Sequence, residues 1–92
     1  MNSIIQTGEP RCYVCGSMVN LEIHHAMHGT ANRKLAEKYH LTVWLCRDHH
    51  TGRLGVHSDP IIDERIKKDA QRAFEAQYGH SMWMQTFRKN YL

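Results

Sequence analysis

The chain has 92 residues, of which 41% are hydrophobic, and a formal net charge of +3 at pH 7. This length fits one domain, residues 1–92, and a core this small often needs a metal site or an interface for stability. The apolar content excludes a disordered chain, and no apolar run is long enough to span a membrane. Because residues 1–10 lack the pattern of a secretory signal, we expect a cytoplasmic protein.

Cysteine and histidine are the most informative residue types in the composition. The chain has three cysteines and eight histidines. Three cysteines cannot all pair within one chain, and disulfides are uncommon in the cytoplasm. The two residue types together therefore indicate metal binding. The mildly basic charge fits a nucleic-acid partner, but many proteins with this charge bind no nucleic acid.

The first half of the chain predicts two short strands joined by a helical segment. Residues 19–25 alternate loosely between apolar and polar side chains, as in a half-buried strand. Residues 31–39 have helical character, with Leu35 and Tyr39 on one face. Residues 41–45 are apolar, β-branched or aromatic, which predicts the best strand of the sequence. A turn rich in cysteine and histidine follows at 46–50.

The second half predicts two helices. Ser58 or Asp59 caps a helix that has Pro60 in its first turn and ends at Gly79. A last helix begins near Ser81. The buried stripe of the first helix is expected to be Ile62, Ile66, Ala70, Ala73, Phe74 and Gln77. Further large side chains assigned to packing are Trp44, Met82, Trp83 and Met84. The sequence thus predicts an α+β fold with a core at about 11–57 and C-terminal helices at about 59–90.

Two pairs of residues have the spacing of zinc knuckles. Two residues separate Cys12 from Cys15, and two separate Cys46 from His49. Zinc prefers four tetrahedral ligands, and each such turn supplies two of them. Because this set uses all three cysteines, we expect a structural Zn²⁺ at these four residues. A redox Cys-x-x-Cys pair is the alternative, and His50 could replace His49 as the zinc ligand.

A second group of histidines lies close in sequence to the predicted zinc site. His24 and His25 end the first strand, and His50 directly follows His49. A strand end, a second strand and the turn after it would bring these side chains together, and His57 could complete the group. Neutral imidazoles tolerate Mn²⁺, Ni²⁺ or Zn²⁺, whereas Mg²⁺ prefers oxygen ligands, so we expect a divalent catalytic metal drawn mainly from the first three. The remaining histidines assigned to surface or packing roles are His28, His40 and His80.

The knuckles and the histidines occur in a characteristic order along the chain. Two Cys-x-x-[Cys/His] knuckles flank the His24–His25 pair, and His50 directly follows the last zinc ligand. In this the sequence resembles HNH endonucleases, and in particular small HNH-like proteins of phages and prophages of Gram-positive bacteria. The resemblance covers nearly the whole chain, through residues 23–25, 29–34, 37–39, 44–46, 49–50, 55–57, 70–74 and 90–92. It implies a small ββα-metal core that carries a zinc knuckle.

The resemblance also implies an activity and roles for individual residues. His25 corresponds to the general base that activates water, and His24 and His50 correspond to ligands of the catalytic metal. Asn32 is the better candidate for the asparagine that orients the base, because the alternative, His40, is of the wrong type. The expected reaction is metal-dependent hydrolysis of phosphodiester bonds in nucleic acid, with DNA as the expected substrate.

Three basic residues near the predicted site are expected to contact the phosphates of the nucleic acid: Arg33, Lys34 and Arg47. The basic residues between 65 and 72 are interpreted as a solvated helix face. Two other functions remain compatible with the sequence. One is a zinc-stabilised nucleic-acid-binding module without cleavage activity, and the other is an adaptor that binds a protein through Trp83 and Phe87. Cleavage that depends on His25 would distinguish the nuclease from both.

Overall fold

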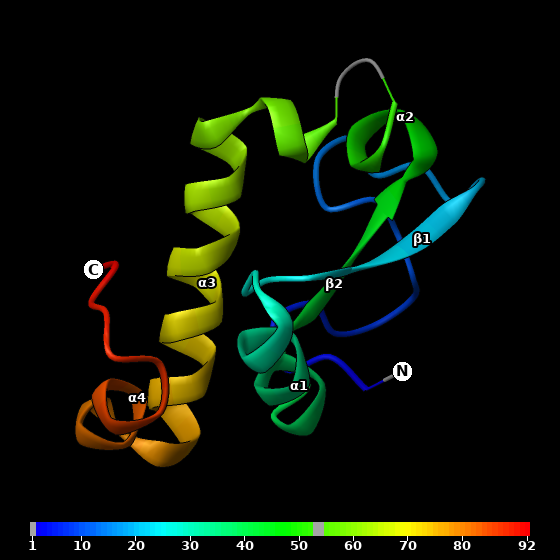
Figure 1. Cartoon of the computed structure of the whole chain (residues 1–92). Coiled ribbons are helices and arrows are strands. Elements are labelled where there is room, and N and C mark those ends of the chain that lie inside the picture. Colours follow the sequence, from blue (N-terminus) through cyan, green and yellow to red (C-terminus); the bar gives the residue numbers. More distant parts are fainter. Residues whose placement is uncertain (1, 53–54) are drawn as a thin grey trace.

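Two antiparallel strands and a long helix organise the computed structural model, which describes residues 2–52 and 55–92 (Figure 1). The elements, in chain order, are β1 (Leu21–His25), α1 (Thr30–Lys38), β2 (Thr42–Cys46), α2 (Arg47–His50), the 3₁₀ helix η1 (Val56–Ser58), α3 (Pro60–Tyr78) and α4 (His80–Phe87). The described part is a small mixed α+β fold, as the sequence predicted. None of its helices is long and apolar enough to cross a membrane.

β1 and β2 pair side by side although α1 separates them in the chain. The register places Glu22 opposite Leu45 and His24 opposite Val43. Beyond the paired residues, the backbone N–H of Ala26 donates to the carbonyl of Leu41 at 3.0 Å. Because the polypeptide passes directly from β2 into α2, the start of β1 lies beside the Cys/His segment 46–50 (Figure 1).

The long helix α3 begins where the sequence indicated. Of the two expected capping residues, Asp59 is the one that acts: its Oδ1 accepts hydrogen bonds from the N–H groups of Ile61 and Ile62 at 3.1 and 3.2 Å. The helix ends before Gly79, whose φ of 86° is a conformation that favours glycine. The side chains fully buried on this helix are Ile66, Ala70, Gln71 and Phe74.

The expected buried stripe of α3 was wrong at one position. Gln77 is exposed, and Gln71 is buried in its place. Tertiary structure explains the burial of Gln71, because the C-terminal segment folds back along α3. The Gln71 side chain donates to Asn90 Oδ1 at 2.7 Å and accepts from the backbone N–H of Tyr91 at 2.7 Å. These two hydrogen bonds satisfy an amide that burial would otherwise penalise.

An aromatic cluster holds α1, α3 and α4 together. Phe74 lies at its centre, with ring-centre distances of 5.0 Å to Tyr39, 5.4 Å to Trp83 and 5.9 Å to Phe87. Edge-to-face contacts of this kind are favourable beyond the apolar area that they bury. Trp83 also donates through Nε1 to the carbonyl of Lys89 at 2.7 Å. This cluster anchors α3, which in turn holds η1 and the residues that follow β1 in place.

Candidate metal centres

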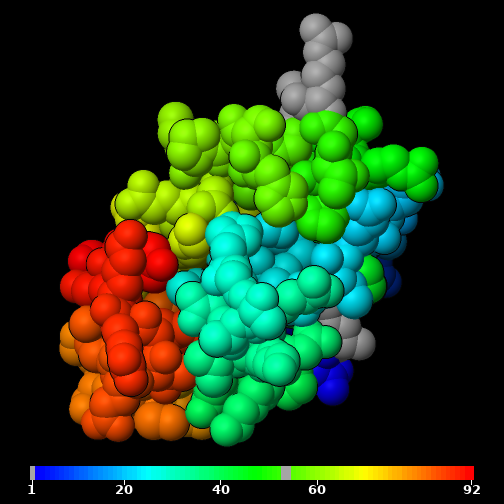
Figure 2. Space-filling view, viewed as in Figure 1, coloured from blue at the N-terminus to red at the C-terminus, as the bar shows by residue number. Residues whose placement is uncertain are grey.

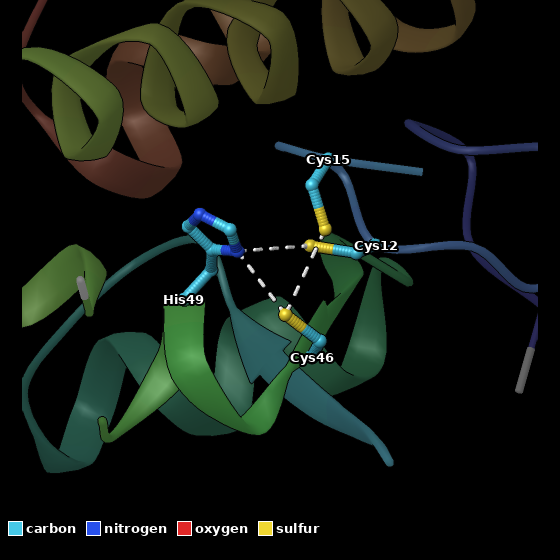
Figure 3. A group of neighbouring side chains, drawn as sticks. All are labelled: Cys12, Cys15, Cys46 and His49. Carbon is cyan, nitrogen blue, oxygen red and sulfur yellow. Dashed lines mark hydrogen bonds between the residues drawn. The ribbon is translucent and has the colours of Figure 1, made fainter. Parts of the chain in front are cut away.

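The structure brings the four predicted zinc ligands together (Figure 3). Their ligand atoms, the Sγ atoms of Cys12, Cys15 and Cys46 and a ring nitrogen of His49, all lie within 4.8 Å of one another. His49 Nδ1 is 3.1 Å from Cys46 Sγ and 3.9 Å from Cys12 Sγ. The Sγ atoms of Cys15 and Cys46 are 3.8 Å apart. His49 therefore faces the cysteines, and His50 does not replace it.

The donor atoms of this cluster are compatible with zinc. Two sulfur atoms bound to one tetrahedral zinc ion at about 2.3 Å lie about 3.8 Å apart, which is the spacing seen here. All three cysteines are free thiols. Burial alone would raise the pKa of Cys12, but hydrogen bonds from the backbone at Cys46, Cys15 and Val14 lower it to about 7, which favours the metal-binding thiolate. The cluster could therefore hold a metal ion.

Local backbone geometry forms the first knuckle. The N–H of Gly16 donates to the carbonyl of Cys12 at 2.9 Å, and the N–H of Cys12 donates to the carbonyl of Ser17 at 2.8 Å. Gly16 has a φ of 77°, which a residue with a side chain rarely adopts. The N–H of Tyr13 donates to the carbonyl of Trp44 on β2 at 2.8 Å. These hydrogen bonds hold the first ligand pair against the strand that leads to the second pair.

A second cluster of histidines surrounds a pocket of about 370 Å³. In Figure 2, the surface of β1 and the start of α1 meets that of α2 and η1 in this region. The predicted metal ligands His24, His50 and His57 offer ring nitrogens within 4.8 Å of one another. The pocket is lined by Ile23, His24, His25, Met27, His28, Gly29, Thr30, Arg33, His50 and His57.

His24 is the most buried member of this group. Its side chain is 2% exposed, and its Nε2 atom is buried with no hydrogen-bond partner among the described residues. Burial is the largest cause that lowers the pKa of His24, followed by the nearby rings of His50, His28 and His57, and the result is a value of about 3. His24 is therefore a neutral imidazole with an unsatisfied buried nitrogen. A cation bound there would satisfy it.

The fold orients the other two candidate ligands. Nδ1 of His50 lies 2.8 Å from Glu22 Oε1, so that the carboxylate accepts the Nδ1 proton and leaves Nε2 available to a metal ion. His57 lies in η1, whose approach to α2 depends on Gly55. A Cβ atom at Gly55 would lie 2.6 Å from the carbonyl oxygen of His50, which is closer than real contacts allow.

His25 lines the same pocket, and a carboxylate holds it in place. Its Nε2 lies 2.7 Å from Oε2 of Glu37 on α1. Because a carboxylate accepts, Nε2 carries the proton and Nδ1 keeps the lone pair. Asn32, expected to orient this histidine, lies in α1 but makes no hydrogen bond to it within the described chain. The residue of α1 that contacts the His25 ring is Glu37, near the C-terminal end of the helix.

Two residues of the histidine cluster were not anticipated. His28, assigned from the sequence to a surface or packing role, offers a ligand atom within 4.8 Å of those of His24 and Asp63. Its Nε2 lies 2.6 Å from Asp63 Oδ1. Its spacing from His24 gives no signal, because four residues bring side chains together on a helix, whereas His24 lies in a strand and His28 lies in the loop after it. No sequence signal linked it to Asp63, which lies 35 residues away on α3.

Of the three basic residues predicted to contact nucleic acid, not all lie at the histidine pocket. Arg33 lines the histidine pocket. Arg47 is exposed, with its Nε 3.8 Å from Oε2 of Glu22. Lys34 is exposed on α1 and is not among the residues that line the pocket. Arg33 is thus the one of the three that lies at the pocket itself.

Comparisons of this chain with models of protein families, with curated proteins and with solved structures found no match.

Proposed function

We propose that the chain is a metal-dependent endonuclease of the HNH type that hydrolyses phosphodiester bonds in DNA. In this proposal β1, β2 and α2 form a ββα-metal core. The observation that carries it is the position of His25, a histidine oriented by Glu37, in the same pocket as the ligand group of His24, His50 and His57. A base and a cation site on one pocket are what phosphodiester hydrolysis requires.

In the proposed hydrolysis, the residues of the pocket have distinct roles. Nδ1 of His25 takes a proton from water, whose oxygen attacks phosphorus while the bond to the departing 3′ oxygen breaks. Glu37 holds the ring and stabilises it after it has gained the proton. His24, His50 and His57 would hold a divalent ion, which would supply charge stabilisation for the phosphate and the leaving oxygen. Ni²⁺ and Zn²⁺ fit these imidazoles better than Mg²⁺.

The N-terminal end of α1 has features that favour phosphate binding. Gly29 and Thr30 line the pocket together with Arg33. The N-terminus of a helix carries free N–H groups and a partial positive charge, both of which favour a phosphate. Arg33 adds a full positive charge on the same side. We propose that these groups hold the backbone of the DNA and that Lys34 and Arg47 contact phosphates further from the cleaved bond.

The cluster of three cysteines and His49 acts, in this proposal, as a structural zinc site. A closed four-ligand site has no open position for chemistry, so its contribution is to folding. It connects the loop before β1 to the end of β2, and His50, a ligand of the second site, directly follows His49. Free thiols persist in the cytoplasm, which is where we propose that the protein acts.

The decisive experiment is nicking of supercoiled plasmid DNA by wild type and His25→Ala across Mn²⁺, Ni²⁺, Mg²⁺ and Zn²⁺. We expect metal-dependent nicking by wild type and a loss of about 10²–10⁴-fold in His25→Ala. His80→Ala is the matched control, because His80 also pairs with a carboxylate, Glu75, at 2.9 Å but lies outside the pocket. DNA binding without nicking under every metal would instead identify a non-cleaving nucleic-acid-binding module.

A further inference from the structure

A second group of possible metal ligands overlaps the first. His24, His28 and Asp63 offer ligand atoms within 4.8 Å of one another, as do His24, His50 and His57. The ring centres of His24 and His28 are 5.5 Å apart, close to the 5.3 Å between His24 and His50. His24 thus belongs to both groups, of which one is completed from α2 and η1 and the other from the segment after β1 and from α3.

His24 has the properties of a shared ligand. It is 2% exposed, and its buried Nε2 has no hydrogen-bond partner in the described chain. A neutral imidazole has one lone pair for a metal, because its other ring nitrogen carries a proton. His24 can therefore serve one of the two groups at a time. The two groups are alternative positions for one cation.

The two positions differ in donor chemistry. One consists of three imidazoles, and the other contains two imidazoles and the Asp63 carboxylate. Imidazole suits Ni²⁺ and Zn²⁺, whereas carboxylate and water suit Mn²⁺ and Mg²⁺. Asp63 also pairs with Lys67, whose Nζ lies 2.8 Å from Oδ2. Oδ1 faces His28, so a cation can replace the proton that now joins this pair.

We propose that the pocket has two overlapping cation positions that share His24, and that the identity of the metal decides which is filled. Ni²⁺ and Zn²⁺ bind to His24, His50 and His57, and Mn²⁺ binds to His24, His28 and Asp63. The second position goes beyond the proposed nuclease site, since neither His28 nor Asp63 has a role there. The inference rests on the proposed function only in placing a cation at His24.

The test is calorimetric titration of the zinc-loaded 92-residue chain with Mn²⁺ and with Ni²⁺, without nucleic acid. Wild type should bind one equivalent of either metal. Asp63→Asn should weaken Mn²⁺ binding at least about tenfold, because loss of a residue that only orients a ligand already lowers metal affinity about tenfold or more, and loss of the ligand itself should cost no less. The same variant should change Ni²⁺ binding less than about threefold. His57→Ala should show the opposite pattern. Glu75→Gln is the matched control, because it disturbs a histidine–carboxylate pair for which the described residues offer no third ligand, and it should change neither affinity.

Three results would overturn the inference. Equal weakening of both metals by Asp63→Asn would mean that Asp63 supports a single site, and no weakening of Mn²⁺ would limit Asp63 to its ion pair with Lys67. Two equivalents of Mn²⁺ or Ni²⁺ in wild type would show that the positions are not exclusive. His28→Ala repeats the test while leaving the Asp63–Lys67 pair intact, which guards against a folding defect in Asp63→Asn. None of these results bears on the proposed function, which the His25-dependent nicking experiment tests separately.

Discussion

The Nε2 atom of His25 lies 2.7 Å from Oε2 of Glu37, so a residue of α1 fixes the ring at the end of β1. Glu37 itself is mostly exposed, while its neighbour Ala36 is fully buried. The burial of Ala36 sets the rotation of α1 about its axis, and this rotation places Glu37 beside His25. The orientation of the proposed base therefore depends on how one helix packs.

Removing the Glu37 carboxylate should impair catalysis without affecting metal binding. We expect Glu37→Ala to lower kcat for plasmid nicking about ten- to a hundredfold with little change in KM, because a misplaced reacting group costs rate rather than affinity. Glu37→Gln should recover part of the loss, because the amide oxygen still accepts from Nε2. Glu64→Ala, an exposed carboxylate on α3, is the control. An equal rise in KM for Glu37→Ala would assign Glu37 to substrate binding instead.

The adjacent residues His24 and His25 should have separable phenotypes. His24→Ala should weaken binding of the catalytic metal, so that excess Ni²⁺ or Mn²⁺ restores part of the nicking activity. His25→Ala should bind metal normally and lose about 10²–10⁴-fold in rate. Higher pH should restore the second variant, because hydroxide needs no base, and extra metal should not. Nicking that survives at wild-type rate in both variants would refute the proposed site.

Loss of the cysteine cluster should unfold the protein rather than inactivate it selectively. We expect Cys46→Ser, or removal of the metal from wild type by a strong chelator, to abolish the cooperative thermal transition followed by circular dichroism. The reason is that binding of a structural zinc is coupled to folding. Elemental analysis of the purified wild type should find one tightly held zinc per chain. A zinc-free protein with a normal melting curve would contradict this prediction.

The hydrogen bond between the Tyr13 hydroxyl and Asp69 should stabilise the fold. It joins the first knuckle to α3, and burial followed by this carboxylate raises the pKa of Tyr13 above its ordinary value. Tyr13→Phe should lower the free energy of unfolding by about 1.5 kcal/mol, as expected for a hydrogen bond to a charged group. Tyr78→Phe is the control, since this more exposed hydroxyl has no hydrogen bond in the described chain, and it should change stability little. Urea denaturation measures both, and equal effects would show that the hydroxyl of Tyr13 contributes nothing specific.

Much of the metal chemistry could be predicted from local sequence. Cys12 and Cys15 share one turn, and Cys46 and His49 share another, so each pair is positioned by a few neighbouring residues. The choice of His49 over His50 also followed from the two-residue spacing, and the structure agrees with it. The strands and the α3 cap were predicted to within about two residues, because their signals are periodicity and side-chain capping.

The partners of the histidines were decided by tertiary structure. Each of three carboxylates pairs with a histidine that is distant in the sequence: Glu37 with His25 (12 residues apart), Glu22 with His50 (28) and Asp63 with His28 (35). Burial of Gln71 in place of Gln77 has the same origin, since the return of the C-terminal segment selects the covered face of α3. The sequence by itself determined which residue types were available to bind metal and which local turns present them. Only the packing of α1, α2 and α3 around the two strands decided which carboxylate meets which imidazole, because a hydrogen bond depends on distance in space and not on separation along the chain.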